Sequence, residues 1–256
     1  MSAGRAHIGC SGWVYKHWRG PVYPPDLPAK KWFEHYTGMF DSVEINNSFY
    51  RLPTAETFRK WRDQAPPGFD YAVKANRYLT QAKKLKDCEE PIERQMASFR
   101  CLGDRLGPIL YQLPPSLKLN LERLESFLRL VPRDVTNVFE FRDRSWYVPD
   151  TLALLERYGA SFCVHDMGGC VTERVAVGPA AVAVVAQPLG QVEHDRDRQA
   201  VVPPGERDER GAGLPLHVRR VDDSEQVITF NDINDGAREV YRIYQNPDGT
   251  AWRKSE

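Results

Sequence analysis

The sequence predicts an α/β protein with the architecture of a TIM-like (β/α) barrel that is atypical or incomplete over its C-terminal quarter. Short β-rich runs alternate with amphipathic stretches, six such runs fall within the first 166 residues, and the chain has 256 residues. A barrel of this kind needs roughly 250 residues. We therefore expect residues 1–256 to form a single domain. Strand count alone leaves a doubly wound open sheet as an alternative.

Composition and charge are those of an ordinary soluble globular protein. Lys and Arg number 35 and Asp and Glu number 35, so no global field favours nucleic acid or anionic lipid. No apolar run approaches the ~20 residues of a membrane helix, and the N-terminus lacks the apolar stretch of a secretory signal. The 5 cysteines contain no C-x-x-C pair, which favours a reducing compartment. We expect a cytoplasmic protein that does not associate with membranes.

The first four strands are predicted from apolar runs bounded by glycine, proline or polar residues. They cover 7–13, 42–49, 69–76 and 109–113. Helical spacing of apolar residues predicts the helices between them at 28–39, from Thr54 to the break at Pro66, and at 91–106. Pro114 and Pro115 lack backbone donors and end the fourth strand.

The same alternation continues through residue 166. Helices are predicted at 119–130 and 149–158, and strands at 137–143 and 161–166. Residues 180–186 are the candidate seventh strand.

Beyond the seventh strand the pattern weakens, because 190–222 has no apolar period and is expected to be a long loop or a disordered insertion. Residues 214–221 and 226–232 compete for the eighth strand. We favour the second, since 236–244 can then form a closing helix.

Charged residues occur in two strands where burial is costly. Val43 and Ile45 alternate with Glu44, and Phe139 and Phe141 alternate with Glu140. Successive strand residues point to opposite faces, so one face of each strand is apolar and the other carries ionisable groups. Charges are seldom buried unless they are paired or used. The pattern predicts a polar site on the sheet.

Several motifs, in one order along about residues 7–167, resemble the YecE-like family, known as domain of unknown function 72. They are GCSGW from Gly9, YKHW from Tyr15, VEINNSFYRLP from Val43, YQLPP from Tyr111 and FEFR from Phe139. The resemblance implies a TIM-like barrel protein of bacteria or archaea and supplies no settled reaction.

The C-terminal part departs from the family pattern. The expected Arg-Leu-His-Gly segment and the Tyr/Gly-rich loop after it are missing beyond Val184, and Phe230-Asn231-Asp232 alone echoes the family near strand eight. Our hypothesis is that residues 170–222 have diverged or that the reading frame is locally altered.

The candidate catalytic residues are Glu44, Lys74 and Glu140. Strand parity places them at the carboxyl ends of a parallel barrel, where active sites of this fold lie. The two carboxylates would act as acid and base, and Lys74 as a nucleophile or proton carrier. The alternative is a structural network in which Glu44 and Glu140 neutralise Lys74 and Arg142.

Other residues are expected to position a substrate by hydrogen bonding or ring stacking. They are Trp13, Asn46, Asn47, Gln112, Arg142, His165 and Asp166. His165 and Asp166, with the two glutamates, are also ligand types for a divalent metal, but adjacent strand residues point to opposite faces and we assign no metal site. The sequence identifies no cofactor.

The leading functional expectation is an enzyme that acts on a small polar substrate, sugar-like or phosphorylated, by acid/base chemistry. The alternative is a non-catalytic protein that binds a ligand or nucleic acid with the same pocket and the basic residues Lys83, Lys84 and Lys86. A small-molecule partner is expected, and the oligomeric state is left open.

Overall fold

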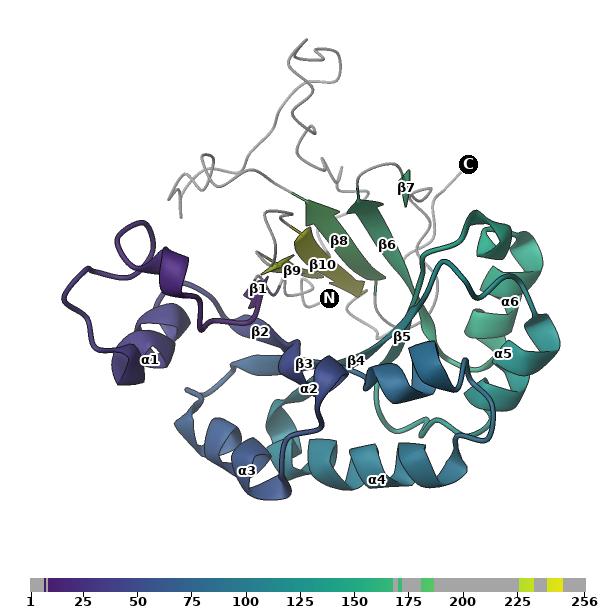
Figure 1. Ribbon diagram of the computed structural model, residues 1–256, viewed down its shortest axis with the longest axis horizontal. Coiled ribbons are helices and arrows are strands. Elements are labelled where there is room, and N and C mark those ends of the chain that lie inside the picture. Colours follow the sequence, from purple (N-terminus) through teal and green to yellow (C-terminus); the bar gives the residue numbers. More distant parts are fainter. Residues whose placement is uncertain are drawn as a thin grey trace, which may run out of the picture.

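The computed structural model is an α/β fold with one curled sheet and helices along its outer side (Figure 1). It describes His7 and residues 9–167, 170–171, 181–186, 226–232 and 239–245, and beyond His165 it describes the backbone alone. The strands are β1 (Gly9–Ser11), β2 (Ser42–Ile45), β3 (Asp70–Lys74), β4 (Leu106–Leu113), β5 (Asn137–Phe141), β6 (Ser161–Met167), β7 (Cys170–Val171), β8 (Ala181–Ala186), β9 (Gln226–Asp232) and β10 (Glu239–Gln245). Their order in the sheet is β1-β2-β3-β4-β5-β6-β8-β10-β9, with β7 paired to β6.

The first six strands are parallel neighbours and form a curled half-barrel. β8 continues this arrangement parallel to β6, whereas β10 is antiparallel to both β8 and β9. β9 approaches β1, so strands from the two ends of the chain lie near each other. The predicted alternation of strands and helices is therefore confirmed over the first 166 residues.

Six α-helices and several short helical turns connect the strands of the described part. The α-helices are α1 (Trp32–Thr37), α2 (Asn47–Tyr50), α3 (Ala55–Gln64), α4 (Glu89–Phe99), α5 (Leu121–Leu128) and α6 (Pro149–Arg157). The turns are η1 (Lys16–Trp18), η2 (Ala29–Lys31), η3 (Tyr78–Ala82), η4 (Arg100–Arg105) and η5 (Arg144–Trp146). Within these described segments, none of the helices has the length and apolar character that spanning a bilayer requires.

Side-chain caps fix the starts of two of these helices. Thr54 Oγ1 accepts a hydrogen bond from the Thr57 amide at the start of α3, and Asn120 Oδ1 accepts one from the Arg123 amide at the start of α5. Each bond satisfies an amide that has no partner within the helix. Gly159 follows α6 with a φ of 66°, a left-handed conformation that glycine adopts without strain.

The hydrophobic core lies between the sheet and the outer helices. Tyr111 of β4 and Phe139 of β5 stack with ring centroids 5.0 Å apart, and Phe127 of α5 packs edge-on against Tyr111 at 5.4 Å. All three rings are fully buried. Because neighbouring strand residues face opposite ways, filling this outer layer with apolar side chains leaves Gln112 and Glu140 for the inner face.

The second strand is shorter than the sequence predicts. β2 ends at Ile45, and residues from Asn47 onward form α2 instead of continuing an extended strand to Phe49. Ser48 Oγ lies 2.7 Å from the Ile45 carbonyl oxygen and 2.6 Å from that of Lys74, and the Phe49 amide donates to the Asn46 carbonyl. These local hydrogen bonds replace the strand ladder.

The closing helix predicted over 236–244 is wrong. This segment contains β10, which pairs with β8 on one side and β9 on the other. Val240, Tyr241 and Ile243 are β-branched or aromatic residues that favour strands, and pairing on both sides satisfies the backbone groups of β10. The predicted strands 180–186 and 226–232 are confirmed as β8 and β9. The predicted loop 190–222 and the competing strand 214–221 lie outside the described residues.

Candidate functional site

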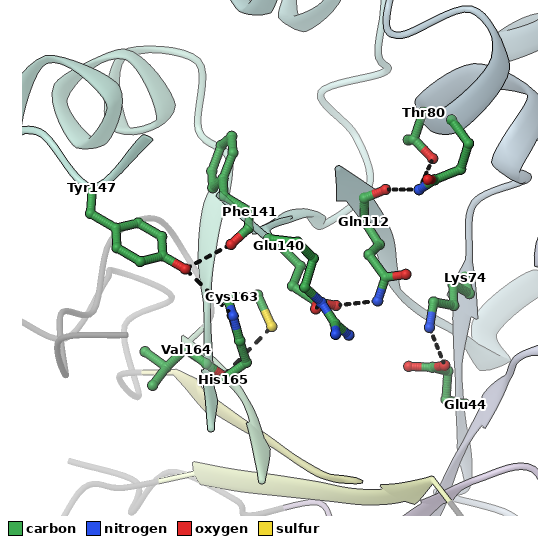
Figure 2. A network of polar contacts seen from close by, with 12 residues as sticks. Glu44, Lys74, Thr80, Gln112, Glu140, Phe141, Tyr147, Cys163, Val164 and His165 are labelled. Carbon is green, nitrogen blue, oxygen red and sulfur yellow. Dashed lines mark hydrogen bonds and ion pairs between the residues drawn. The ribbon is translucent and has the colours of Figure 1, made fainter. Parts of the chain in front are cut away.

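The inner face of the half-barrel carries polar side chains from five neighbouring strands, and all but Gln112 are buried (Figure 2). Glu44 comes from β2, Lys74 from β3, Gln112 from β4, Glu140 from β5 and His165 from β6. We call these five residues, with Ser11 and Arg142, the inner polar cluster. The structure thus brings together all three predicted catalytic residues.

Glu44 links the first three strands. Its Oε1 atom accepts a hydrogen bond of 2.9 Å from Ser11 Oγ, and Lys74 Nζ lies 4.0 Å from the same oxygen. The register explains the first contact, because Ser11 of β1 pairs directly with Glu44 of β2. All three residues are buried, so the glutamate and the ammonium group interact with little screening by water.

Glu140 is held from two sides. Gln112 Nε2 donates a hydrogen bond of 2.9 Å to Glu140 Oε2, and Arg142 Nε donates to Oε1. Gln112 and Glu140 are direct partners in the parallel pairing of β4 and β5, which explains why an amide from one strand meets a carboxylate from the next. The Arg142 side chain keeps 19% of its surface exposed, whereas that of Glu140 is completely buried.

The surroundings of Glu140 keep it ionised. Burial alone would raise its pKa, but the charges of Arg142, His165 and Lys74 and the hydrogen bond from Gln112 outweigh burial and lower the pKa to about 2. At neutral pH Glu140 is therefore a fixed carboxylate and not a proton donor.

Two further groups lie near His165 (Figure 2). Tyr147 Oη donates a hydrogen bond of 2.7 Å to the Phe141 carbonyl oxygen and lies 3.4 Å from His165 Nε2. Cys163 lies two residues before His165 on the inner face of β6. Burial raises the pKa of its thiol well above the usual range, and the charge of Glu140 adds to this effect. The protonated thiol is a poor nucleophile.

Lys74 is fixed by the segment that follows β2. Its ammonium group lies 5.3 Å from the ring centroid of Phe49, and its carbonyl oxygen accepts from Ser48 Oγ. Both contacts come from α2, so the early end of β2 places this helix over Lys74.

Three predicted substrate-binding residues lie elsewhere or only beside the cluster. Asn46 is buried where β2 ends, and Asn47 is exposed at the start of α2. The Trp13 ring packs against Phe33 and Trp61 at centroid distances of 5.1 and 5.7 Å, in the layer between sheet and helices. Aromatic packing therefore takes Trp13 away from the inner face. Asp166 lies in β6, and its side chain is outside the described atoms.

The sequence interpretation missed Ser11, Tyr147 and Cys163. Strand parity could have identified two of them, because Ser11 lies two positions after Gly9 and Cys163 two positions before His165, so that each pair faces the same side of its strand. Tyr147 follows η5, outside any strand, where strand parity makes no prediction. Among the residues the structure describes, no group of three or more His, Cys, Asp or Glu side chains is arranged to hold a metal ion.

The fold and site define a class of protein: an α/β half-barrel with a buried, charge-balanced cluster on its inner face. The family model described as "Protein of unknown function DUF72" matches residues 7–247. The chain belongs to this family, as its sequence motifs predict.

Two curated bacterial proteins are similar in sequence to this chain. The chain is 23% identical to the UPF0759 protein YunF of Bacillus subtilis over 262 residues, which cover 95% of this chain and 89% of that protein. It is 26% identical to the UPF0759 protein YecE of Escherichia coli K12 over 115 residues, which cover 44% of this chain and 42% of YecE.

Solved structures support the fold. A DUF72 family protein from Thermotoga maritima superposes with a TM-score of 0.59 at 28% identity, covering 68% of this chain and 70% of that one. A DUF72 family protein from Enterococcus faecalis gives a TM-score of 0.55 at 18% identity, covering 68% and 66% of the two chains. The second likeness concerns the fold alone.

Proposed function

We propose that this chain is an enzyme that acts on a small polar substrate, sugar-like or phosphorylated, by acid/base chemistry at the mouth of its barrel. The observation that carries the proposal is the placement of two acid–base pairs, Glu44 with Lys74 and Glu140 with Arg142, on one inner face, with all but Arg142 buried. A barrel interior is ordinarily filled by Val, Ile and Leu. Placing charges there is costly unless they are used.

Proton transfer is assigned to Glu44 and Lys74. Their charged atoms lie 4.0 Å apart, beyond direct hydrogen bonding, so a substrate hydroxyl oxygen lying beside the pair can be within hydrogen-bond distance of both, giving its proton to the carboxylate and taking one from the ammonium group. Ser11 holds the carboxylate in position. This arrangement supplies one acid and one base from adjacent strands.

We assign Glu140 a different role from the acid/base role predicted from the sequence. With a pKa of about 2 it is an ionised anchor for Arg142. Arg142 donates to Glu140 through Nε, and a guanidinium group is the kind of side chain that binds phosphate, carboxylate or paired hydroxyl groups. Gln112 and His165 complete the positioning set, and Asn46 borders it.

We further propose that the sheet closes into a TIM-like barrel, with β8, β10 and β9 bridging β6 to β1. The approach of β9 to β1 supports this closure.

A cytoplasmic location is also proposed, since the described cysteines Cys10, Cys88, Cys101 and Cys163 are all free thiols. The expected partner is a small molecule, without membrane association.

Turnover measurements on a library of sugars and sugar phosphates test the proposal. We expect the wild type to convert at least one compound and Glu44→Gln to lose about 10²–10⁴-fold in kcat. Ser126→Ala, which changes an exposed hydroxyl on α5, is the matched surface control. Binding of a library compound without conversion by the wild type would support the non-catalytic alternative and contradict the assigned chemistry.

A further inference from the structure

A pocket of about 760 Å³ lies outside the inner polar cluster, between α2, the turn η3 and the start of α4. Ser48 connects the two regions. Its Oγ contacts the Lys74 carbonyl oxygen, and its own carbonyl oxygen accepts a hydrogen bond of 2.8 Å from Asn76 Nδ2 on the pocket wall. The volume is within the range of small-molecule sites.

Two tyrosines give this pocket an unusual surface. Tyr50 is 59% exposed and Tyr78 is 51% exposed, and both line it. Arg77 lies 5.6 Å from the Tyr50 ring centroid, and Lys83 lies 5.8 Å from that of Tyr78. A cation over one face of each ring restrains the orientation of the ring and leaves its other face for stacking.

The charges lining the pocket balance. Three cationic and three carboxylate side chains share it: Arg51, Lys83, Arg94, Asp87, Glu89 and Glu90. With equal numbers of both signs, the lining has no net positive charge to attract a phosphate or a nucleic-acid backbone. Carboxylates and guanidinium groups together instead supply acceptors and donors for neighbouring hydroxyl groups.

The pocket wall is preorganised. Asn76 Oδ1 accepts from the Tyr78 amide at 2.9 Å, and the buried Gln95 accepts from the Asn76 amide at 3.3 Å. The loop after η3 contains Lys84, Leu85 and Asp87, the three non-glycine residues of the described chain with positive φ. Such conformations are costly and persist where the surroundings impose them, often at binding sites.

We infer that this pocket binds a neutral sugar, a mono- or disaccharide, by stacking it on Tyr50 and Tyr78 and bonding its hydroxyl groups to the mixed charges around them. Two exposed rings, a balanced set of donors and acceptors and a fixed wall together favour this ligand class over an anionic one. The inference stands apart from the proposed function, because it needs no turnover and no residue of the inner polar cluster.

Ligand-observed NMR and calorimetry on the full chain test the inference. The probes are glucose, galactose, maltose and cellobiose, with inorganic phosphate and AMP as anionic contrasts. We expect saturable binding of at least one neutral sugar, and we expect Tyr50→Ala and Tyr78→Ala each to weaken it about tenfold. Leu119→Ala, an exposed apolar residue elsewhere, is the matched control and leaves the affinity unchanged.

Two further variants separate this site from the inner polar cluster. Glu44→Gln and Lys74→Met are expected to leave sugar affinity in the pocket unchanged, even if they abolish turnover. The inference is overturned if no neutral sugar saturates the wild type, if only phosphate or AMP binds, or if binding survives in the Tyr50→Ala/Tyr78→Ala double variant. Loss of sugar binding in Lys74→Met, with binding retained in the tyrosine variants, would also overturn the inference, because it would show that the sugar binds at the inner polar cluster.

Discussion

Glu140 illustrates what a sequence can and cannot establish about a charged residue. Alternation with Phe139 and Phe141 predicts that its side chain faces the barrel interior, and the structure places it there. Its protonation behaviour depends on Arg142, which follows β5, on Gln112 of β4 and on His165 of β6. That balance of burial against neighbouring charge depends on distances, which strand parity does not supply.

The low pKa of Glu140 predicts a specific acid sensitivity. The ordinary value of 4.5 applies to the unfolded chain and about 2 to the folded protein, so the unfolded chain binds this proton more tightly. Its contribution to stability, about 3 kcal/mol, is complete above pH 4.5 and is lost as the pH falls toward 2. Urea unfolding at a series of acidic pH values measures this loss. Parallel pH profiles for wild type and Glu140→Gln would contradict it.

Removing one partner of the Glu140–Arg142 pair is expected to cost more than removing both. Glu140→Gln leaves a largely buried guanidinium group without its carboxylate and should destabilise the protein by about 3–5 kcal/mol. Adding Arg142→Met should recover most of that loss, because the orphaned charge disappears. Urea denaturation of the two single variants and the double variant gives the coupling energy. Additive losses would show that the two residues do not act as a pair.

Among secondary-structure elements, α2 departs most from its predicted form and matters most for the site. The alternation over Val43–Tyr50 is typical of a strand, yet Ser48 bonds the chain back onto itself. The hydrogen bond from Ser48 to the carbonyl of Lys74, 26 positions away, is a tertiary contact that periodicity does not predict. The turn places Phe49 over Lys74 and Tyr50 in the neighbouring pocket.

Ser48→Ala tests this role of α2. The variant removes the one hydroxyl proton that the Ile45 and Lys74 carbonyl oxygens share, so we expect a destabilisation of about 1–3 kcal/mol. Ser126→Ala removes an exposed hydroxyl that bonds to the Glu122 carbonyl, and it should change stability by no more than about 0.5 kcal/mol. Thermal unfolding of the two variants measures how much stability each one loses. Equal losses would mean that Ser48 does not hold α2 in place.

Over the whole chain, prediction succeeded where structure is locally encoded. Strand and helix periods gave the alternating α/β order through residue 166, and conspicuous motifs gave the family. It failed at 236–244, where apolar spacing suits a helix or a strand and pairing with β8 and β9 decides between them. Strand parity predicted which side chains of β2 to β6 face the inner polar cluster. Trp13 lies outside the cluster, because aromatic residues of α1 and α3 pack around its ring.

The most direct test of an inner ligand site is a thermal-shift screen of the wild type against a metabolite library, repeated on Lys74→Met. We predict that at least one compound at saturating concentration raises the Tm of the wild type by about 5 °C and that Lys74→Met loses this shift. Lys60→Met, an exposed lysine on α3, should retain it. A library that stabilises nothing, or one in which every stabilising compound raises the Tm of Lys74→Met as much as that of the wild type, would contradict the assignment of the inner polar cluster as a binding site.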